Sequence, residues 1–465
     1  MRILHAIHDF LPRHRAGSEI YAFELARAQS TDHHVTVLCA DYDPARRHGQ
    51  VTWRVHGGLP VVEIVNNWHC ASFEDTYRPP LITERIEQVL RAVQPEVVHV
   101  HNLLNLSFDL PALAHAHGSA VVATLHDHSL VCPSGGQRIH RADEHLCEVI
   151  DTDRCARCFQ DSPFHAQISF ARLSAITGSP GRMHRAAAAG LRRFPMLGHR
   201  VARTVRNTAT IETGKAQIDE RLRAARRLFD EVDLFVAPSM SMSSQFQLAG
   251  IEASKIETSD YGFAPLVRRT NGHRVAGRPL RIGYVGTLVW HKGVHVLIDA
   301  VRAFGPGEYE LKIFGSPDTF SEYSASLRTQ SRGLSVQFMG AFEREHVDDV
   351  YGQIDVLVVP SLWYENSPLV IHEAYQAGVP VVGARIGGIT DLVEHGRTGF
   401  LYNPRSPIEL VAALRRLLED RSLLRTLADG AGTRPRVKSM VDDAREWEVR
   451  YADTIRRRPV PVPAS

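Results

Sequence analysis

The sequence has no apolar run that approaches the roughly 18 residues a helix needs to cross a membrane. The apolar run near its start is also too short for a secretory signal peptide. An excess of charge of one sign is lacking as well, because 54 basic residues stand against 52 acidic ones. A balanced charge gives no global signal for nucleic-acid binding. We therefore expect a cytoplasmic protein that does not bind nucleic acid.

Cysteine is scarce, with six in 465 residues. In a reducing compartment such residues are more often thiols or metal ligands than disulfides. Four of them lie between residues 132 and 158, and the last two form a C-x2-C pair, a spacing that suits a tetrahedral structural zinc. Four sulfur ligands would leave no open position for catalysis, and simple free thiols are the alternative. The four residues are Cys132, Cys147, Cys155 and Cys158.

Acidic residues are absent from residues 172–206, where arginines are interleaved with apolar side chains and Pro195 interrupts any single helix. A basic amphipathic segment of this kind can rest on an anionic bilayer surface. That hypothesis predicts peripheral contact with the inner face of the membrane. The commoner alternative is a helical face exposed to solvent.

Apolar residues make up 44% of the chain and charged residues 23%, as in an ordinary globular protein. The length predicts two domains with substantial cores. Short apolar strands alternate with helical segments in both halves, a pattern typical of parallel sheets covered on both faces. The predicted fold class is therefore α/β. The expected strands are residues 2–7, 34–39, 60–65, 97–100, 121–125, 232–237, 281–286, 311–315, 336–340, 356–359 and 379–382.

Two carboxylates bracket a predicted helix start in the segment E-N-S-P-L-V-I-H-E. Glu365 precedes the helix and Glu373 lies more than one turn inside it, while Ser367 is the natural N-cap before a proline. The free amides that follow, near Leu369 and Val370, can hold an anion. An anion site between two carboxylates suits a ligand that carries both phosphate and hydroxyl groups.

Four further residues end or follow predicted strands, and a doubly wound sheet binds ligands at the carboxyl ends of its strands. Gly17 precedes the first predicted helix, and His126 follows the strand at 121–125. In the second half, Gly286 frees the backbone to approach an anion and Lys292 supplies a mobile positive charge. The alternatives are a plain turn, a structural histidine and a surface lysine.

The motif E-N-S-P-L-V-I-H-E, together with G-V-P-V-V and G-G-I-T-D-L-V downstream, resembles the retaining family-4 glycosyltransferases. The resemblance implies the GT-B fold, in which two Rossmann-like, doubly wound parallel-sheet domains face a central cleft. It implies that Glu373 binds the ribose of a nucleotide-diphosphate sugar, and that Glu365 and His126 lie beside the donor sugar. Gly17 would lie beside the donor phosphates or the acceptor.

The segment G-T-L-V-W-H-K-G resembles the phosphate-binding loop of the same family, with Lys292 as its lysine. Thr287 stands where the family usually has an arginine, so one of two expected phosphate cations is missing; His291 or an arginine from elsewhere is the predicted substitute. Neutralisation of the phosphate by lysine and amides makes a catalytic metal unnecessary.

The resemblance also divides the chain. We predict an acceptor-binding domain over residues 1–270, with the cysteine-rich and basic insertion at about 130–230, and a nucleotide-sugar-binding domain over 271–435. A C-terminal helix, 436–458, would cross back to the first domain, and 459–465 would be a disordered tail.

The predicted function is transfer of a sugar, with retention, to a hydroxyl of a glycan, lipid-linked or small-molecule acceptor. The main alternative is a scaffolding protein that binds nucleotide sugars but has lost turnover, which only Thr287 supports. A glycosidase pair would also use two carboxylates, but it has no use for the anion site at Gly286 and Lys292. A third view makes the cysteine-rich and basic segments a zinc-dependent binding module.

Overall fold

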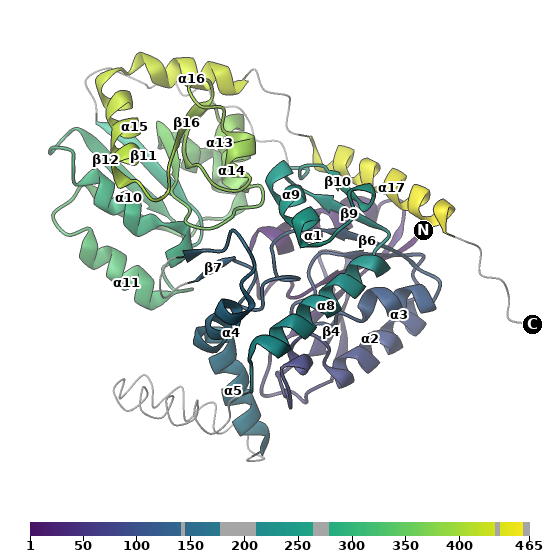
Figure 1. Ribbon diagram of the computed structural model, residues 1–465. Helices are drawn as coiled ribbons and strands as arrows, with labels where there is room; N and C mark the ends of the chain where they lie inside the picture. Colours follow the sequence, from purple (N-terminus) through teal and green to yellow (C-terminus); the bar gives the residue numbers. More distant parts are fainter. Residues whose placement is uncertain (141–144, 177–210, 264–278, 433–437, 459–465) are drawn as a thin grey trace, which may run out of the picture.

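The computed structural model describes residues 1–140, 145–176, 211–263, 279–432 and 438–458. These residues fold around two separate sheets, one in each half of the chain (Figure 1). No helix among them combines the length and the hydropathy that a membrane crossing requires. The basic segment beyond residue 176, the domain boundary near residue 270 and the tail from residue 459 lie outside the described residues.

The first sheet has eight strands in the order β10-β9-β6-β5-β1-β2-β4-β3. All neighbouring strands are parallel except β3 and β4, which form an antiparallel pair at one edge. The central strands are apolar on both sides because helices cover both faces. The strands are β1 (Arg2–Ile7), β2 (His34–Asp41), β3 (Val51–His56), β4 (Leu59–Val65), β5 (Val97–Val100), β6 (Ala120–Thr124), β9 (Leu234–Ala237) and β10 (Ile256–Thr258).

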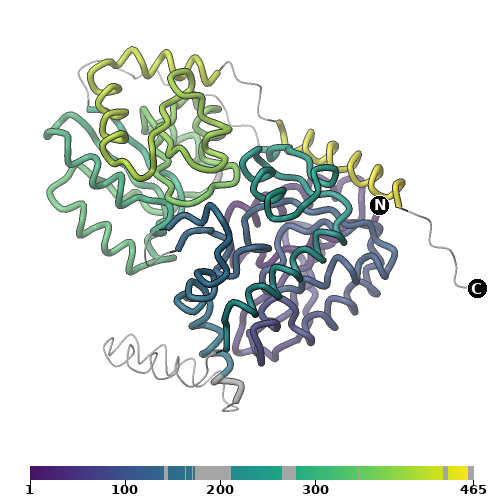
Figure 2. Tube along the Cα trace, in the orientation of Figure 1, coloured from purple at the N-terminus to yellow at the C-terminus, as the bar shows by residue number. Residues whose placement is uncertain are grey.

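Helices α1 and α17 pack on one face of this sheet, and α2, α3 and α8 on the other. Helix α17 comes from the C-terminal end of the chain, and Figure 2 shows this yellow segment returning to the domain that holds the N-terminus. Trp447 and Tyr451 of α17 are buried there with Tyr21 of α1. The helices are α1 (Gly17–Gln29), α2 (Pro80–Val93), α3 (Leu110–Ala116), α8 (Lys215–Glu231), α9 (Met240–Ala249) and α17 (Met440–Arg457).

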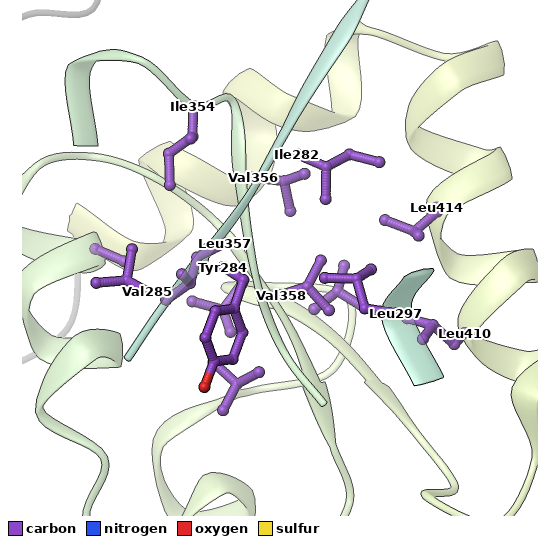
Figure 3. Packing of buried hydrophobic residues seen from close by; sticks show 14 of the residues in the cluster. Ile282, Tyr284, Val285, Leu297, Ile354, Val356, Leu357, Val358, Leu410 and Leu414 are labelled. Carbon is purple, nitrogen blue, oxygen red and sulfur yellow. The ribbon is translucent and has the colours of Figure 1, made fainter. Parts of the chain in front are cut away.

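The second sheet has six parallel strands in the order β13-β12-β11-β14-β15-β16. Figure 3 shows Ile282 and Val356 of its central strands packed towards Leu297, Leu410 and Leu414 of the covering helices. The strands are β11 (Leu280–Val285), β12 (Tyr309–Phe314), β13 (Val336–Gly340), β14 (Val356–Val359), β15 (Val381–Ala384) and β16 (Gly399–Tyr402). The helices are α10 (Val294–Val301), α11 (Ser321–Gln330), α12 (Val347–Gly352), α13 (Leu369–Gln376), α14 (Ile389–Leu392), α15 (Pro407–Glu419) and α16 (Ser422–Gly432).

The cysteine-rich insertion begins with a small antiparallel hairpin, β7 (Ile139–His140) and β8 (His145–Leu146). Helices α4 (Thr152–Asp161) and α5 (Pro163–Ile176) follow it. Buried Ile139 and Leu146 join the core of the C-terminal domain. The Arg138 guanidinium lies 5.6 Å from the ring centroid of Tyr364. The insertion therefore reaches across to the loop that carries Glu365.

The prediction of an α/β fold with two doubly wound parallel sheets is confirmed, and every expected strand is present with small shifts at its ends. Five of the described strands were missed: β3, the hairpin strands β7 and β8, the three-residue edge strand β10, and β16. Strand β3 is an exposed edge that owes its position to an antiparallel turn at Gly57 and Gly58, both with positive φ. Strand β16 is four residues long and directly follows a turn.

Candidate active site

Lys292 and Glu365 meet at the carboxyl end of the second sheet, although 73 residues separate them in the chain. Lys292 ends a single turn of 3-10 helix (Trp290–Lys292) after β11, and Glu365 lies in the loop after β14. The Lys292 Nζ lies 2.7 Å and 2.9 Å from the two oxygens of Glu365. The ammonium also lies 5.0 Å from the centroid of the Trp363 ring. Two predicted site residues therefore form one ion pair.

The Glu365 carboxylate is almost completely buried, whereas the Lys292 side chain is 27% exposed. Two more groups donate to the carboxylate, the Ser361 hydroxyl at 2.6 Å and the Trp363 Nε1 at 2.8 Å. A buried charge needs such partners because desolvation would otherwise disfavour it. The lysine is the mobile, solvent-facing member of the pair and can turn towards an anion.

Helix α13 begins just after the loop that carries Glu365, and its start presents free backbone donors. Within the described residues, the N–H groups of Leu369 and Val370 have no hydrogen-bond acceptor, as expected at a helix start. The predicted N-cap was wrong: Pro368, with an extended ψ of 113°, occupies that position, and its fixed ring sets the entry angle. The Ser367 hydroxyl lies 2.9 Å from the His372 Nε2 instead.

Gly17 brings the first domain against this helix start. A side-chain carbon at Gly17 would lie 3.5 Å from Leu369 Cδ1. The glycine begins α1, so the N-terminal ends of α1 and α13 face each other across the two domains. The structure thus brings together two residues that were predicted separately.

Glu373 lies inside α13 and is buried. The Tyr351 hydroxyl donates to its Oε2 at 3.0 Å and also contacts the Val370 carbonyl. This tyrosine comes from α12 and fixes the carboxylate orientation. The sequence offered no signal for it.

Gly286 does not offer its amide to a ligand. Its N–H donates to the Phe314 carbonyl at 3.0 Å and extends the pairing of β11 with β12, so the predicted anion contact through this amide is wrong. Its φ of +148° still requires glycine and turns the chain after the strand. Thr287, in the place of the expected arginine, is exposed, and its carbonyl accepts from the Tyr284 hydroxyl. The His291 ring is buried, 5.1 Å from the Trp363 ring.

His126 follows β6 as predicted, but both its ring nitrogens have partners within the first domain. Nε2 lies 3.0 Å from His101 Nδ1, and Nδ1 lies 2.9 Å from the Tyr261 hydroxyl. Burial lowers the pKa of His126 to about 3. This arrangement matches the structural alternative, and the ring offers no free nitrogen for proton transfer.

Asn366 and Tyr261 make the contact between the domains next to Glu365. The Asn366 amide nitrogen donates to the His126 carbonyl at 2.7 Å and to the Tyr261 hydroxyl at 3.0 Å. The His372 Nε2 also lies 3.2 Å from Asp260 of the first domain. Sequence reasoning passed over Asn366, although its place beside Glu365 in the motif was a signal.

A polar cluster lies between the end of β1 and the first turn of α1. The His8 Nε2 lies 3.6 Å from Glu19 and 3.9 Å from Asp9, and Glu19 is buried. Burial raises the pKa of Asp9, against the lowering effect of nearby histidines. These groups can accept and donate hydrogen bonds to a hydroxyl-rich molecule on the first-domain side.

A metal site needs at least three His, Cys, Asp or Glu side chains with one ligand atom each, all within a few ångströms. In the described residues, two groups have three such atoms within 4.8 Å of one another. One is the cluster of His8, Asp9 and Glu19, and the other is His5, His99 and His101. The four clustered cysteines form no such group and are free thiols. Burial raises the pKa of Cys147 to about 11, with the neighbouring thiols adding to the shift. The sulfur atoms would have to move closer to hold zinc, and the zinc site stays a prediction.

Two family profiles match the chain. The one described as "Glycosyltransferase Family 4" covers residues 15–167, and the one described as "Glycosyl transferases group 1" covers residues 279–420. One profile thus includes the loop with Gly17, and the other includes the ion pair and α13. The chain belongs to glycosyltransferase family 4.

Curated relatives resemble parts of this family 4 glycosyltransferase. The sulfoquinovosyl transferase SQD2 of Arabidopsis thaliana is 39% identical over 102 residues, covering 21% of this chain and 20% of that protein. The amylovoran biosynthesis glycosyltransferase AmsK of Erwinia amylovora is 27% identical over 207 residues, 43% of this chain and 51% of that protein. The D-inositol 3-phosphate glycosyltransferase of Corynebacterium glutamicum is 30% identical over 196 residues, covering 39% of this chain and 46% of that protein. The chain spans about half, or less, of the length of these relatives.

Solved structures match the glycosyltransferase over nearly its whole length. Anabaena Alr3699/HepE in complex with UDP has a TM-score of 0.61 at 17% identity, covering 98% of this chain and all of that one. Sucrose-phosphate synthase from Thermosynechococcus elongatus has a TM-score of 0.65 at 17% identity, covering 98% of this chain and 99% of that one. The two-domain GT-B architecture is therefore confirmed.

Proposed function

We propose that this protein transfers a sugar from a nucleoside diphosphate sugar to an acceptor hydroxyl, with retention of the anomeric configuration. The observation that carries the proposal is the Lys292–Glu365 pair, together with the free amides of Leu369 and Val370 at the start of the helix that follows Glu365. Positive charge and oriented N–H groups suit a leaving diphosphate, because they stabilise the charge that develops on it. A glycosidase would gain nothing from this anion site.

The donor would lie mainly on the C-terminal domain. Lys292 would turn to the diphosphate, and the start of α13 would hold its oxygens. The carboxylate of Glu373, oriented by Tyr351, would accept hydrogen bonds from the ribose hydroxyls. Glu365 would be released from the lysine and accept hydrogen bonds from the donor sugar.

The acceptor would approach from the first domain, where His8, Asp9 and Glu19 follow β1. We favour front-face substitution. The bond from the anomeric carbon to the phosphate oxygen breaks while a bond to the acceptor oxygen forms on the same face. The acceptor proton passes to the leaving phosphate oxygen, so no protein base is required. This fits the His126 ring, whose nitrogens are both engaged.

The glycan or lipid-linked nature of the acceptor, the peripheral membrane contact and the structural zinc stay predictions. HepE was crystallised with UDP and with UDP-glucose. Uridine nucleotides are therefore the first donors to try.

A thermal-shift panel of nucleoside diphosphate sugars tests the donor site. We expect at least one donor to raise the melting temperature of the wild-type protein and to lose that effect in Glu373→Ala. Glu419→Ala, at the exposed end of α15, is the control and should keep the shift. If no donor stabilises the wild type, the donor site is wrong. If a donor binds but is neither transferred nor hydrolysed, the protein is the scaffolding alternative.

A further inference from the structure

A chain of hydrogen bonds starts at the contact between the domains and runs into the first domain. The Asn366 amide nitrogen lies 3.0 Å from the Tyr261 hydroxyl, which lies 2.9 Å from His126 Nδ1. His126 Nε2 lies 3.0 Å from His101 Nδ1, and His101 Nε2 lies 2.9 Å from His5 Nδ1. We call the first-domain part of this chain, from Tyr261 to His5 together with Gln29, Tyr451 and His99 described next, the histidine relay.

The relay continues through the core to the C-terminal helix. His5 Nε2 lies 2.9 Å from the Gln29 Oε1, and the Gln29 amide nitrogen lies 3.2 Å from the Tyr451 hydroxyl. That hydroxyl lies 2.6 Å from His99 Nδ1, and His99 Nε2 ends on the Thr124 hydroxyl at 2.8 Å. Strands β1, β5 and β6 and helices α1 and α17 all contribute.

Two backbone groups, the His126 carbonyl and the Ser367 N–H, fix how the Asn366 amide is turned and so set the direction of the relay. The Asn366 nitrogen donates to the His126 carbonyl, and its oxygen accepts from the Ser367 N–H at 2.6 Å, so the amide can face only one way. The Tyr261 oxygen is then an acceptor for Asn366, and its proton is donated to His126 Nδ1. His126 must therefore carry its proton on Nε2 and donate to His101.

The same logic passes along each imidazole. A neutral imidazole has one donor and one acceptor, so His101 and His5 also carry their protons on Nε2. Burial holds the pKa of His5 at about 4 and those of His99 and His101 well below the ordinary value. Each ring nitrogen is paired and each ring is neutral. The close approach of His5, His99 and His101 therefore has an explanation that needs no metal.

We propose that the histidine relay is a positioning device that holds Tyr261 and the His126 carbonyl in place to receive Asn366. The proposal rests on the proposed function, because Asn366 adjoins Glu365 and so ties the donor-sugar loop to the first domain. The relay residues touch no substrate. Their contribution is to favour the closed arrangement of the two domains.

Breaking the relay inside the core should loosen that contact. If His101 offers no acceptor, the His126 Nε2–H is buried without a partner, and the imidazole does better with its proton on Nδ1. That proton would then face the Tyr261 proton, so Tyr261 would rotate away from the position that receives Asn366. The donor site itself, on the other domain, would be unchanged.

Two neighbouring tyrosines provide a matched test. Tyr261 and Tyr21 are each 4% exposed, and their ring centroids lie 4.5 Å apart. Tyr261→Phe removes a relay hydroxyl. Tyr21→Phe removes one that donates to Asp443 at 2.8 Å and lies outside the relay. His101→Phe breaks the relay within the core. Gln29→Leu is a milder break and serves as the core variant if His101→Phe does not fold.

The measurements are UDP binding by calorimetry, turnover of UDP-glucose or of the donor that the panel identifies, and the radius of gyration by small-angle X-ray scattering. We expect Tyr261→Phe and the core variant to lower kcat about tenfold, the worth of one net hydrogen bond. Their Kd for UDP should stay within about twofold of wild type, and their radius of gyration should increase. Tyr21→Phe should change neither turnover nor scattering.

The proposal is overturned if the relay variants and Tyr21→Phe give the same turnover and the same scattering. Absence of turnover in the wild type refutes the proposed function instead, and the scattering comparison then decides the relay by itself. A loss of UDP affinity in the relay variants would also contradict the proposal, because it would mean that the relay shapes the donor site rather than the contact between domains.

Discussion

Replacing Lys292 by methionine should destabilise the C-terminal domain in a way that a second substitution relieves. Glu365 is buried, and its charge is compensated by Lys292 at 2.7 Å. Lys292→Met keeps the aliphatic stem but leaves a buried carboxylate with only the Ser361 and Trp363 donors. Glu365→Gln removes that charge and still accepts from both donors.

The size of the effect follows from the burial of the two partners. Removing one partner of a fully buried ion pair costs about 3–5 kcal/mol. The lysine is 27% exposed and two neutral donors remain, so about 2–3 kcal/mol is the better value here. For a domain of this size that corresponds to a fall of roughly 5–10 °C in melting temperature.

Thermal and urea denaturation of the single and double variants would measure the coupling. We expect the stability order to be wild type, Glu365→Gln, the double variant and then Lys292→Met. Two results would contradict this reasoning: Lys292→Met is as stable as the wild type, or the double variant is less stable than Lys292→Met. Either would mean that the carboxylate is not a buried charge held by the lysine. Addition of UDP should stabilise the wild type more than either lysine variant.

Three further results are expected. Gly293→Ala should lower the free energy of unfolding, measured by urea denaturation, by more than about 2 kcal/mol, because the new carbon would clash with the Pro360 carbonyl at 1.9 Å. Gly340→Ala is the control. Gly340 has a similar positive φ but open space around it, so this substitution should cost about half as much. Stability should fall below pH 6.5, since burial lowers the pKa of His5 to about 4 and of His126 to about 3, and only the unfolded chain then takes up protons. Each such histidine removes about 1.4 kcal/mol at pH 5.5, and a flat stability between pH 7 and 5 would refute the buried neutral state. Metal analysis of the purified protein should find one zinc per chain that is lost when Cys155 and Cys158 are both replaced by serine; full-length protein without zinc would leave the four cysteines as thiols.

The sequence by itself determined the strands and helices, and the order of the residues around the helix start in E-N-S-P-L-V-I-H-E. Alternation of short apolar runs with helical segments predicts two parallel sheets, because that periodicity is set by residues close together in the chain. The spacing in E-N-S-P-L-V-I-H-E likewise places Glu365 before a helix and Glu373 inside it, as the structure has them. Such features depend on the backbone preferences of a few neighbours.

Only the tertiary structure decided which distant groups meet. Strand order places Lys292 against Glu365 and turns the Gly286 amide into a sheet hydrogen bond with Phe314. It also buries His126 in a chain of neutral rings that passes through Tyr451 of the C-terminal helix. These outcomes depend on which strands are neighbours and on where α17 packs. A pairing between segments that are far apart in the chain leaves no periodic trace in either of them.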